Sequence, residues 1–250
     1  MAIRIFIDEQ EVKAEPGESV LAVARRAGFD IPALCYHEAV DSIGACRLCL
    51  VEVLAGSRPG ISTSCNMKVE DGLRIATDSP QIRRDRASNL ELLLLRAPAN
   101  PVLRDLAARW GVRPRLQPPP DAGIANCILC ELCVRVCAAL GHNALAAVGR
   151  GEKKRVGPAF GKPSEGCVGC GACLSVCPTR CIVMKETSAA RTIWGQSFDF
   201  HRCRVCGQPV ITERHRAFAI ARCGLPEDYY DVCESCKQSQ ASQRFAGVVW

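Results

Sequence analysis

The feature that most constrains this chain is a repeated run of cysteines near its middle. Cys127-x2-Cys130-x2-Cys133-x3-Cys137 recurs as Cys167-x2-Cys170-x2-Cys173-x3-Cys177, with the same offset of 40 residues at all four positions. Loops of this spacing wrap three thiolates round one 4Fe–4S cube, and the fourth cysteine ligates the other cube. The repeat therefore predicts two cubes. One is held by Cys127, Cys130, Cys133 and Cys177, and the other by Cys137, Cys167, Cys170 and Cys173.

Residues around the repeat fit this interpretation. In the pattern for such loops, a proline follows the fourth cysteine. Pro178 follows Cys177 and fits the pattern, whereas Ala138 follows Cys137 and departs from it. Gly169 and Gly171 suit a tightly wrapped loop, because glycine allows close approach of the backbone. We expect Cys181 to pack beside a cube without binding it. The alternative, zinc or structural thiols, is disfavoured by the presence of two complete runs.

The cysteine content also bears on compartment and charge. The chain contains eighteen cysteines. Its N-terminus carries Asp8 and Glu9 where a signal peptide would be apolar. It has no run of about 20 apolar residues, the length that a membrane span needs. We therefore expect a cytoplasmic protein without a transmembrane segment, and metal rather than disulfides. Metal-bound cysteines are thiolates, so four such sites would lower the formal charge of +6 to about −2. Nucleic-acid binding is accordingly not expected.

A second cysteine block lies in the N-terminal part, as Cys35-x10-Cys46-x2-Cys49-x15-Cys65. Two thiolates per iron would make these four the ligands of a 2Fe–2S cluster, although plant-type ferredoxins have four residues in the first gap. A four-cysteine zinc knuckle is the alternative, and His37 is expected to pack nearby. Alternating isoleucines predict a strand over 3–7, with a hairpin partner expected over 10–14. An amphipathic pattern ended by Gly28 predicts a helix over 19–27, and a further strand is expected over 50–54. The result would be a small mixed sheet.

A cysteine-free stretch separates these blocks. Leucines at helical spacing predict helices over 79–116, divided at Pro98 and Pro101, which we interpret as a packing bridge between cluster domains. The run Pro118-Pro119-Pro120 indicates a stiff boundary after them.

The last block contains two C-x2-C knuckles, 26 residues apart. Two such knuckles predict a zinc ribbon, and a helix over 213–222 could fill the long spacer. A rubredoxin-like iron or a third cube remain alternatives. Cys223 is expected to be a free thiol, and His201 a surface or neighbouring residue rather than a ligand. The proposed zinc ligands are Cys203, Cys206, Cys233 and Cys236.

Two stretches carry a family resemblance. Cys35-Tyr-His, Gly44-Ala-Cys-Arg-Leu-Cys-Leu-Val-Glu-Val53 and Ser64-Cys65 resemble the N-terminal domain of the complex I large iron–sulfur subunit and the diaphorase subunit of NAD-linked hydrogenases. Cys127-Ile-Leu-Cys-Glu-Leu-Cys-Val-Arg-Val-Cys137 with Cys177-Pro-Thr179 resembles the same subunits and two-cluster bacterial ferredoxins. The resemblance implies a β-grasp fold for the first domain.

These relatives usually carry another 4Fe–4S site, with one histidine and three cysteines, after the leucine-rich helix. Residues 93–105 here contain neither residue type, so we predict that this cluster is lost. Electrons would then pass between the 2Fe–2S centre and the cubes directly or through a cluster of a partner.

The expected organisation is α+β in four parts: a β-grasp 2Fe–2S domain at 1–78, a helical linker at 79–121, a bacterial-type 2[4Fe–4S] ferredoxin domain at 122–190 and a zinc ribbon at 191–250. A basic loop lies between the two cysteine runs that are predicted to bind the cubes. It is either solvated or a docking edge for an acidic partner, and it carries Arg150, Lys153, Lys154, Arg155 and Lys162.

No dinucleotide fingerprint, P-loop or catalytic constellation is present in the sequence. We therefore expect a non-catalytic electron-transfer subunit of a multi-subunit oxidoreductase. The resemblance to the diaphorase subunit implies that it is NAD(H)-linked, with a flavin- and NAD(H)-binding partner subunit. It also implies a catalytic partner, such as a hydrogenase, formate dehydrogenase or other low-potential reductase. The rivals are a free-standing multi-cluster carrier and, more remotely, a zinc-binding interaction scaffold.

Overall fold

The computed structural model describes residues 3–115 and 126–246, with the side chains described as far as residue 243. It divides into two compact units. One comprises residues up to Val136 together with Val176–Cys181. The other comprises Cys137–Ser175 and the residues from Ile182 onward. The four-part division expected from the sequence stays a prediction, because one compact unit can contain several domains.

The N-terminal unit begins with a five-stranded mixed sheet of order β2-β1-β5-β3-β4. Its strands are β1 (Ile3–Ile7), β2 (Gln10–Ala14), β3 (Leu50–Ala55), β4 (Gly60–Thr63) and β5 (Arg74–Ala76). β1 pairs with β5 in parallel, and the other pairs are antiparallel. A mixed sheet of this order with one covering helix is the β-grasp arrangement that the resemblance implied.

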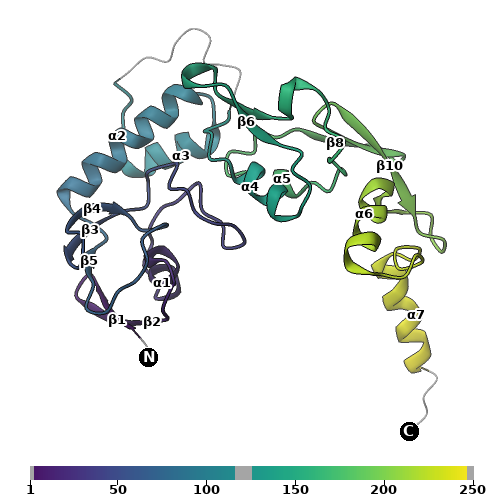
Figure 1. Cartoon of the computed structure of the whole chain (residues 1–250), viewed down its shortest axis with the longest axis horizontal. Coiled ribbons are helices and arrows are strands. Elements are labelled where there is room, and N and C mark those ends of the chain that lie inside the picture. The colour runs from purple at the N-terminus through teal and green to yellow at the C-terminus, as the bar shows by residue number, and fades with distance from the viewer. Residues whose placement is uncertain (1–2, 116–125, 247–250) are drawn as a thin grey trace. The chain divides into compact units, whose positions relative to one another are not determined.

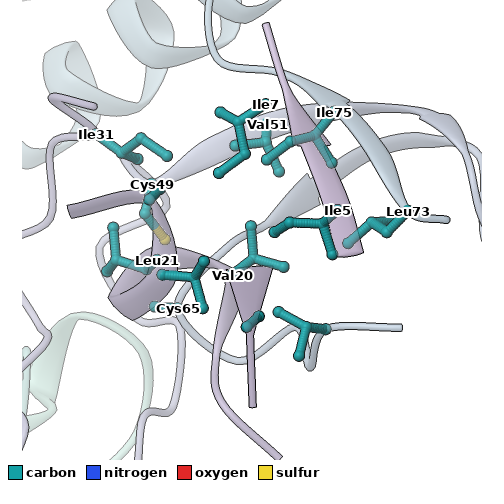
Figure 2. Close-up of a cluster of buried hydrophobic side chains, with 14 of the residues drawn as sticks. Ile5, Ile7, Val20, Leu21, Ile31, Cys49, Val51, Cys65, Leu73 and Ile75 are labelled. Carbon is teal, nitrogen blue, oxygen red and sulfur yellow. The ribbon is translucent and has the colours of Figure 1, made fainter. Parts of the chain in front are cut away.

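That helix, α1 (Val20–Arg26), begins at the N-cap Ser19, whose Oγ accepts a hydrogen bond from the Ala22 amide at 3.2 Å. It buries Val20, Leu21, Val23 and Ala24 in the same core as Ile5 and Ile7 of β1. Figure 2 shows Cys49 and Cys65 beside Leu21 at one end of this core. The predicted strands over 3–7 and 10–14 and the predicted helix are therefore confirmed.

Two helices follow, as the leucine spacing predicts. α2 (Pro80–Arg96) begins after the N-cap Ser79, and α3 (Pro101–Trp110) after the N-cap Asn100. Both start with proline, which suits the first turn because it needs no amide donor there. The two helices pack on each other (Figure 1). Leu90, Leu94 and Leu103 of these helices lie in one buried hydrophobic cluster. The loss of a histidine-ligated cluster from this region stays a prediction.

The second unit is built on a four-stranded antiparallel sheet of order β11-β10-β9-β8. Its strands are β8 (Met184–Glu186), β9 (Ala190–Ile193), β10 (Gln196–Arg202) and β11 (Pro209–Thr212). A short hairpin of β6 (Ala146–Val148) and β7 (Arg155–Gly157) precedes it, with 3₁₀ turns η2 (Gly151–Lys153) and η3 (Ala159–Gly161).

Short helices carry the cysteine runs and the C-terminal part. α4 (Leu132–Ala139) and α5 (Ala172–Ser175) lie in the two cube runs. α6 (Glu213–Cys223) occupies the spacer where a helix was expected, and α7 (Glu234–Ala246) follows the second knuckle. Within the described ranges, no helix is both long and apolar enough to cross a membrane.

Candidate iron–sulfur and metal centres

The four cysteines of the N-terminal block lie together at the edge of the β-grasp core, and all are buried. The Cys46 amide donates to Cys35 Sγ at 3.3 Å, and the Leu34 amide donates to Cys46 Sγ at 3.4 Å. Hydrogen bonds from backbone amides to sulfur stabilise a thiolate. This loop therefore presents buried sulfur atoms with donors already in place, as a buried 2Fe–2S site requires.

The two cube runs are divided between the units in a specific way. Cys177, from the second run, lies in the unit that holds Cys127, Cys130 and Cys133. Cys137, from the first run, lies in the unit that holds Cys167, Cys170 and Cys173. The chain thus exchanges the fourth cysteine of each run, which is the arrangement that the two-cube spacing predicts.

In the N-terminal unit, two residues hold the loops that contain Cys177 and Cys127. The Asn100 amide Nδ2 donates to the Thr179 carbonyl at 2.8 Å, and Arg96 Nε donates to the Cys127 carbonyl at 3.2 Å. Asn100 is completely buried, and its Oδ1 also caps α3 by accepting from the Leu103 amide. One side chain thereby joins a helix start to a cluster loop.

Cys181 lies against this group, with its Sγ 3.6 Å from Cys177 Sγ. Its thiol hydrogen-bonds to Cys127 and Cys177 and lowers the pKa of both, while these bonds raise the pKa of Cys181 itself. Cys181 is accordingly the thiol of this trio that favours keeping its proton. This fits a residue that contacts a cluster ligand without being one.

In the second unit, Cys137, Cys167, Cys170 and Cys173 line a single cavity, together with His142, Ile193 and Trp194. Trp194 Nε1 donates to Cys173 Sγ at 3.4 Å, and the Ala144 amide donates to Cys137 Sγ at 3.3 Å. Burial raises the pKa of the thiols of Cys137 and Cys173, so metal binding there must displace protons.

The backbone of the two cube runs repeats as faithfully as the cysteines. Gly169 and Gly171 have φ of +70° and +80°, and Leu129 and Glu131, 40 residues earlier, have φ of +54° and +57°. The loop thus needs left-handed backbone at both positions, which glycine adopts without strain. A Cβ at Gly169 would also lie 2.8 Å from the Phe198 ring.

The C-terminal cysteines form the most compact group of potential metal ligands in the described part of the chain. The sulfur atoms of Cys203, Cys206, Cys233 and Cys236 all lie within 4.8 Å of one another. The Cys206–Cys233 sulfur distance is 3.7 Å, and four thiolates around one zinc ion at 2.3 Å would be about 3.8 Å apart. The group fits one tetrahedral ion better than a cube, in which each thiolate binds a different iron.

Neighbouring residues support this geometry. The Cys233 amide donates to Cys203 Sγ at 3.3 Å and lowers the pKa of that thiol to about 6. Both ring nitrogens of His201 are engaged by carboxylates, Nδ1 with Glu213 and Nε2 with Asp231, each at 3.0 Å. His201 therefore neighbours the site without offering it a nitrogen, and Cys223 lies exposed outside the group.

Residues that sequence reasoning did not single out are Asn100, Trp194, His142 and three arginines, Arg86, Arg96 and Arg135. Apart from His142, each donates a hydrogen bond to a sulfur or carbonyl group that is distant in sequence, so no local spacing could have identified those contacts. For Trp194 the separation from Cys173 is 21 residues, and for Arg135 it is 100 residues from Cys35.

Comparison with known proteins defines the class. Residues 1–80 match the family of 2Fe-2S iron-sulfur cluster binding domains, and residues 122–184 match the 4Fe-4S dicluster domains. The chain therefore combines a 2Fe–2S domain with a two-cluster 4Fe–4S domain.

The relatives make the class more specific. The chain is 31% identical to a subunit of an NADH-quinone oxidoreductase of Rhizobium meliloti over 82% of its length and 27% of that protein. It is 29% identical to the NADPH-Fe(3+) oxidoreductase subunit alpha of Geobacter sulfurreducens over 85% of its length and 28% of that protein. It thus spans little more than a quarter of these curated relatives.

A solved structure agrees. An NAD+-reducing NiFe hydrogenase in its H2-reduced state contains a chain that matches with a TM-score of 0.62 and 25% identity, covering 85% of this chain and 94% of that one. The chain is thus similar to this NADH-quinone oxidoreductase subunit and to this hydrogenase chain, as its sequence resemblance indicated.

Proposed function

We propose that this chain is the electron-transfer iron–sulfur subunit of a multi-subunit NAD(P)H-linked oxidoreductase. It would relay single electrons between a flavin-bearing, NAD(H)-binding subunit and a catalytic subunit, such as a hydrogenase, a formate dehydrogenase or another low-potential reductase. The observation that carries the proposal is the exchange of Cys137 and Cys177 between the two cube groups. A two-cluster ferredoxin requires this exchange, whereas a zinc scaffold does not.

The proposed ligand sets follow the cysteine groups described above. The 2Fe–2S cluster would bind Cys35, Cys46, Cys49 and Cys65. The first cube would bind Cys127, Cys130, Cys133 and Cys177, and the second Cys137, Cys167, Cys170 and Cys173. The zinc ion would bind Cys203, Cys206, Cys233 and Cys236. We place the protein in the cytoplasm, because cysteines that are to bind metal need a reducing compartment that keeps them from pairing as disulfides.

The clusters supply one-electron redox chemistry when bound, and the chain tunes it. Buried loops exclude water from the sulfur atoms, and N–H donors such as those of Cys46, Ala144 and Trp194 stabilise the added negative charge of the reduced state. The C-terminal site, one ion surrounded by four thiolates, would serve the fold rather than the redox chemistry.

Metal analysis of anaerobically purified protein tests the proposal. We expect about 10 iron atoms and one zinc per chain, with electron paramagnetic resonance signals from three clusters on reduction. About 14 iron atoms without zinc would replace the zinc site with a third cube. Zinc at all of the cysteine sites, with little iron, would instead support the zinc-binding interaction scaffold. A monomer that never co-purifies with flavoprotein would favour the free-standing carrier.

Two cysteine variants sharpen this test. Cys177→Ala should lose the iron of the first cube and keep that of the second, whereas Cys181→Ala should retain both. The reverse result would exchange the roles of the two thiols, which lie 3.6 Å apart.

A further inference from the structure

The 2Fe–2S loop and the first cube loop share one buried cluster of side chains in the N-terminal unit. Cys35 and Cys46 of the first loop pack in it with Ile128, Cys130 and Leu132 of the second. Leucines of α2 and α3, with Leu48, complete the cluster. The two candidate centres are therefore neighbours inside one compact unit, and something must set their separation.

Arg135 joins these loops directly. Its Nη2 donates to the Cys35 carbonyl at 2.9 Å and to the Cys130 carbonyl at 3.1 Å. Its Nη1 donates to the Asp41 carbonyl, also in the loop between Cys35 and Cys46. A single guanidinium thus binds one ligand residue of each candidate cluster.

The surroundings of Arg135 make this contact rigid and electrostatically strong. The side chain is half-buried on α4, two residues after Cys133, and its Nε is buried without a hydrogen-bond partner among the described residues. A planar fork loses little further freedom per hydrogen bond that it forms. A positive charge that is partly withdrawn from water acts strongly on nearby negative charge, because the local dielectric is low.

We propose that Arg135 is a positioning residue that fixes the separation of the 2Fe–2S centre and the first cube, and that its charge raises the reduction potentials of both. This inference rests on the cluster assignments of the proposed function. Reduction adds one negative charge to a cluster, so a cation held against both loops favours the reduced state of each. The same bridge would hold the two clusters at a constant distance for electron transfer.

Two other arginines provide matched controls, because each donates a hydrogen bond to a carbonyl in or beside one of the two loops. Arg96 Nε donates to the Cys127 carbonyl of the cube loop. Arg86 donates to the Leu48 and Leu50 carbonyls beside Cys49, at 3.1 and 2.7 Å. Each should therefore influence its own cluster, whereas Arg135 should influence both.

The test measures the midpoint potentials of both clusters by redox titration followed by electron paramagnetic resonance, in the purified full chain. Arg135→Gln removes the charge and should lower both potentials. Arg96→Gln should lower that of the first cube alone, and Arg86→Gln that of the 2Fe–2S centre alone. Arg135→Lys keeps the charge and should restore most of both shifts. If Arg135→Gln shifts one potential or neither, or if Arg135→Lys shifts both as far as Arg135→Gln does, the proposal is wrong.

A second measurement tests the bridge itself. The magnetic interaction between the two reduced clusters should weaken in Arg135→Gln and stay at its wild-type strength in both control variants. If Arg135→Gln does not retain its iron, Arg135→Lys decides by the same measurement. Its single ammonium lacks the fork, so the interaction should weaken, and an unchanged interaction overturns the proposal. Wild-type protein that lacks either cluster signal would instead refute the proposed function, so the two failures can be told apart.

Discussion

At the scale of the residue, the candidate cluster sites differ in the individual N–H groups that donate hydrogen bonds to their cysteine sulfur atoms. Among the described side chains, the Trp194 indole offers a neutral N–H to Cys173, a proposed cluster ligand, from the turn between β9 and β10. Such a bond strengthens when the cluster gains an electron. This hydrogen bond would therefore raise the reduction potential of one cluster without a charged side chain.

Trp194→Phe should lower the potential of the second cube, because phenylalanine keeps an aromatic ring in the cavity and removes only the donor. A neutral hydrogen bond is worth about 1 kcal/mol, which for one electron corresponds to about 40 mV. Redox titration of the full chain checks this, with the first cube as internal control. Equal shifts of both cubes, or none, would contradict it.

Gly169 lies where the second cube loop has both left-handed backbone and a close neighbour. Gly169→Ala should destabilise the second unit by more than Gly195→Ala, measured as the free energy of unfolding. Both positions have positive φ, which costs an alanine about 1 kcal/mol. Only at Gly169 does the new Cβ also meet the Phe198 ring, at 2.8 Å, since nothing lies within 4 Å at Gly195. Equal losses would show that the ring moves aside freely.

At the scale of the element, the N-terminal end of a helix can also hold a loop that carries a proposed cluster ligand. The N-cap of α3, Asn100, also binds the carbonyl of Thr179, two residues after Cys177. The N-cap of α2, Ser79, only caps its helix, with its Oγ accepting from the Ile82 amide at 3.3 Å. Both residues cap a helix, but only Asn100 also binds a loop that contains a proposed cluster ligand. Substitutions at the two positions can therefore be compared directly.

Asn100→Ala should cost about 2–3 kcal/mol of stability, because it removes a cap and leaves a buried carbonyl without its donor. Ser79→Ala should cost about 1 kcal/mol. Chemical unfolding of the anaerobic protein gives both values. Iron analysis should also show faster loss of the first cube in Asn100→Ala only, and equal iron loss in the two variants would contradict a role in holding Cys177.

At the scale of the whole molecule, we expect the C-terminal part to depend on the proposed metal for stability. Of the described residues 203–243, only Cys203, Thr212 and Val232 are buried, and α6 buries none of its residues. Such a segment lacks a hydrophobic core, so metal binding would supply much of its folding free energy. Thr212 nevertheless contacts the second cube loop, its hydroxyl donating to the Val168 carbonyl at 2.6 Å.

Removal of the proposed zinc should therefore unfold this segment and expose the second cube. A zinc chelator should increase hydrogen exchange over residues 203–243 and accelerate iron loss from the second cube, while the first cube and the 2Fe–2S centre persist. Cys206→Ser should reproduce the effect without a chelator, and Cys223→Ser, outside the ligand group, should not. Unchanged exchange after complete zinc loss would contradict a folding role.

Much of this architecture was predictable because the signals are local. Alternating isoleucines, an amphipathic pattern and leucines at helical spacing predicted β1, α1, α2 and α3, and the structure confirms them. The resemblance to the diaphorase-type subunits is confirmed, as are the 2Fe–2S and two-cluster 4Fe–4S domains. The zinc ion, the individual ligand sets and the domain boundaries stay predictions.

The sequence by itself grouped the cysteines into predicted ligand sets, because a wrapped loop is specified by spacing over a few residues. Tertiary structure alone decided what surrounds them. Arg135 meets Cys35 across 100 residues, Asn100 meets Thr179 across 79 and Trp194 meets Cys173 across 21. Contacts of that kind arise from the packing of whole elements, which no local pattern encodes. They are the contacts that would set the potentials and the separation of the clusters.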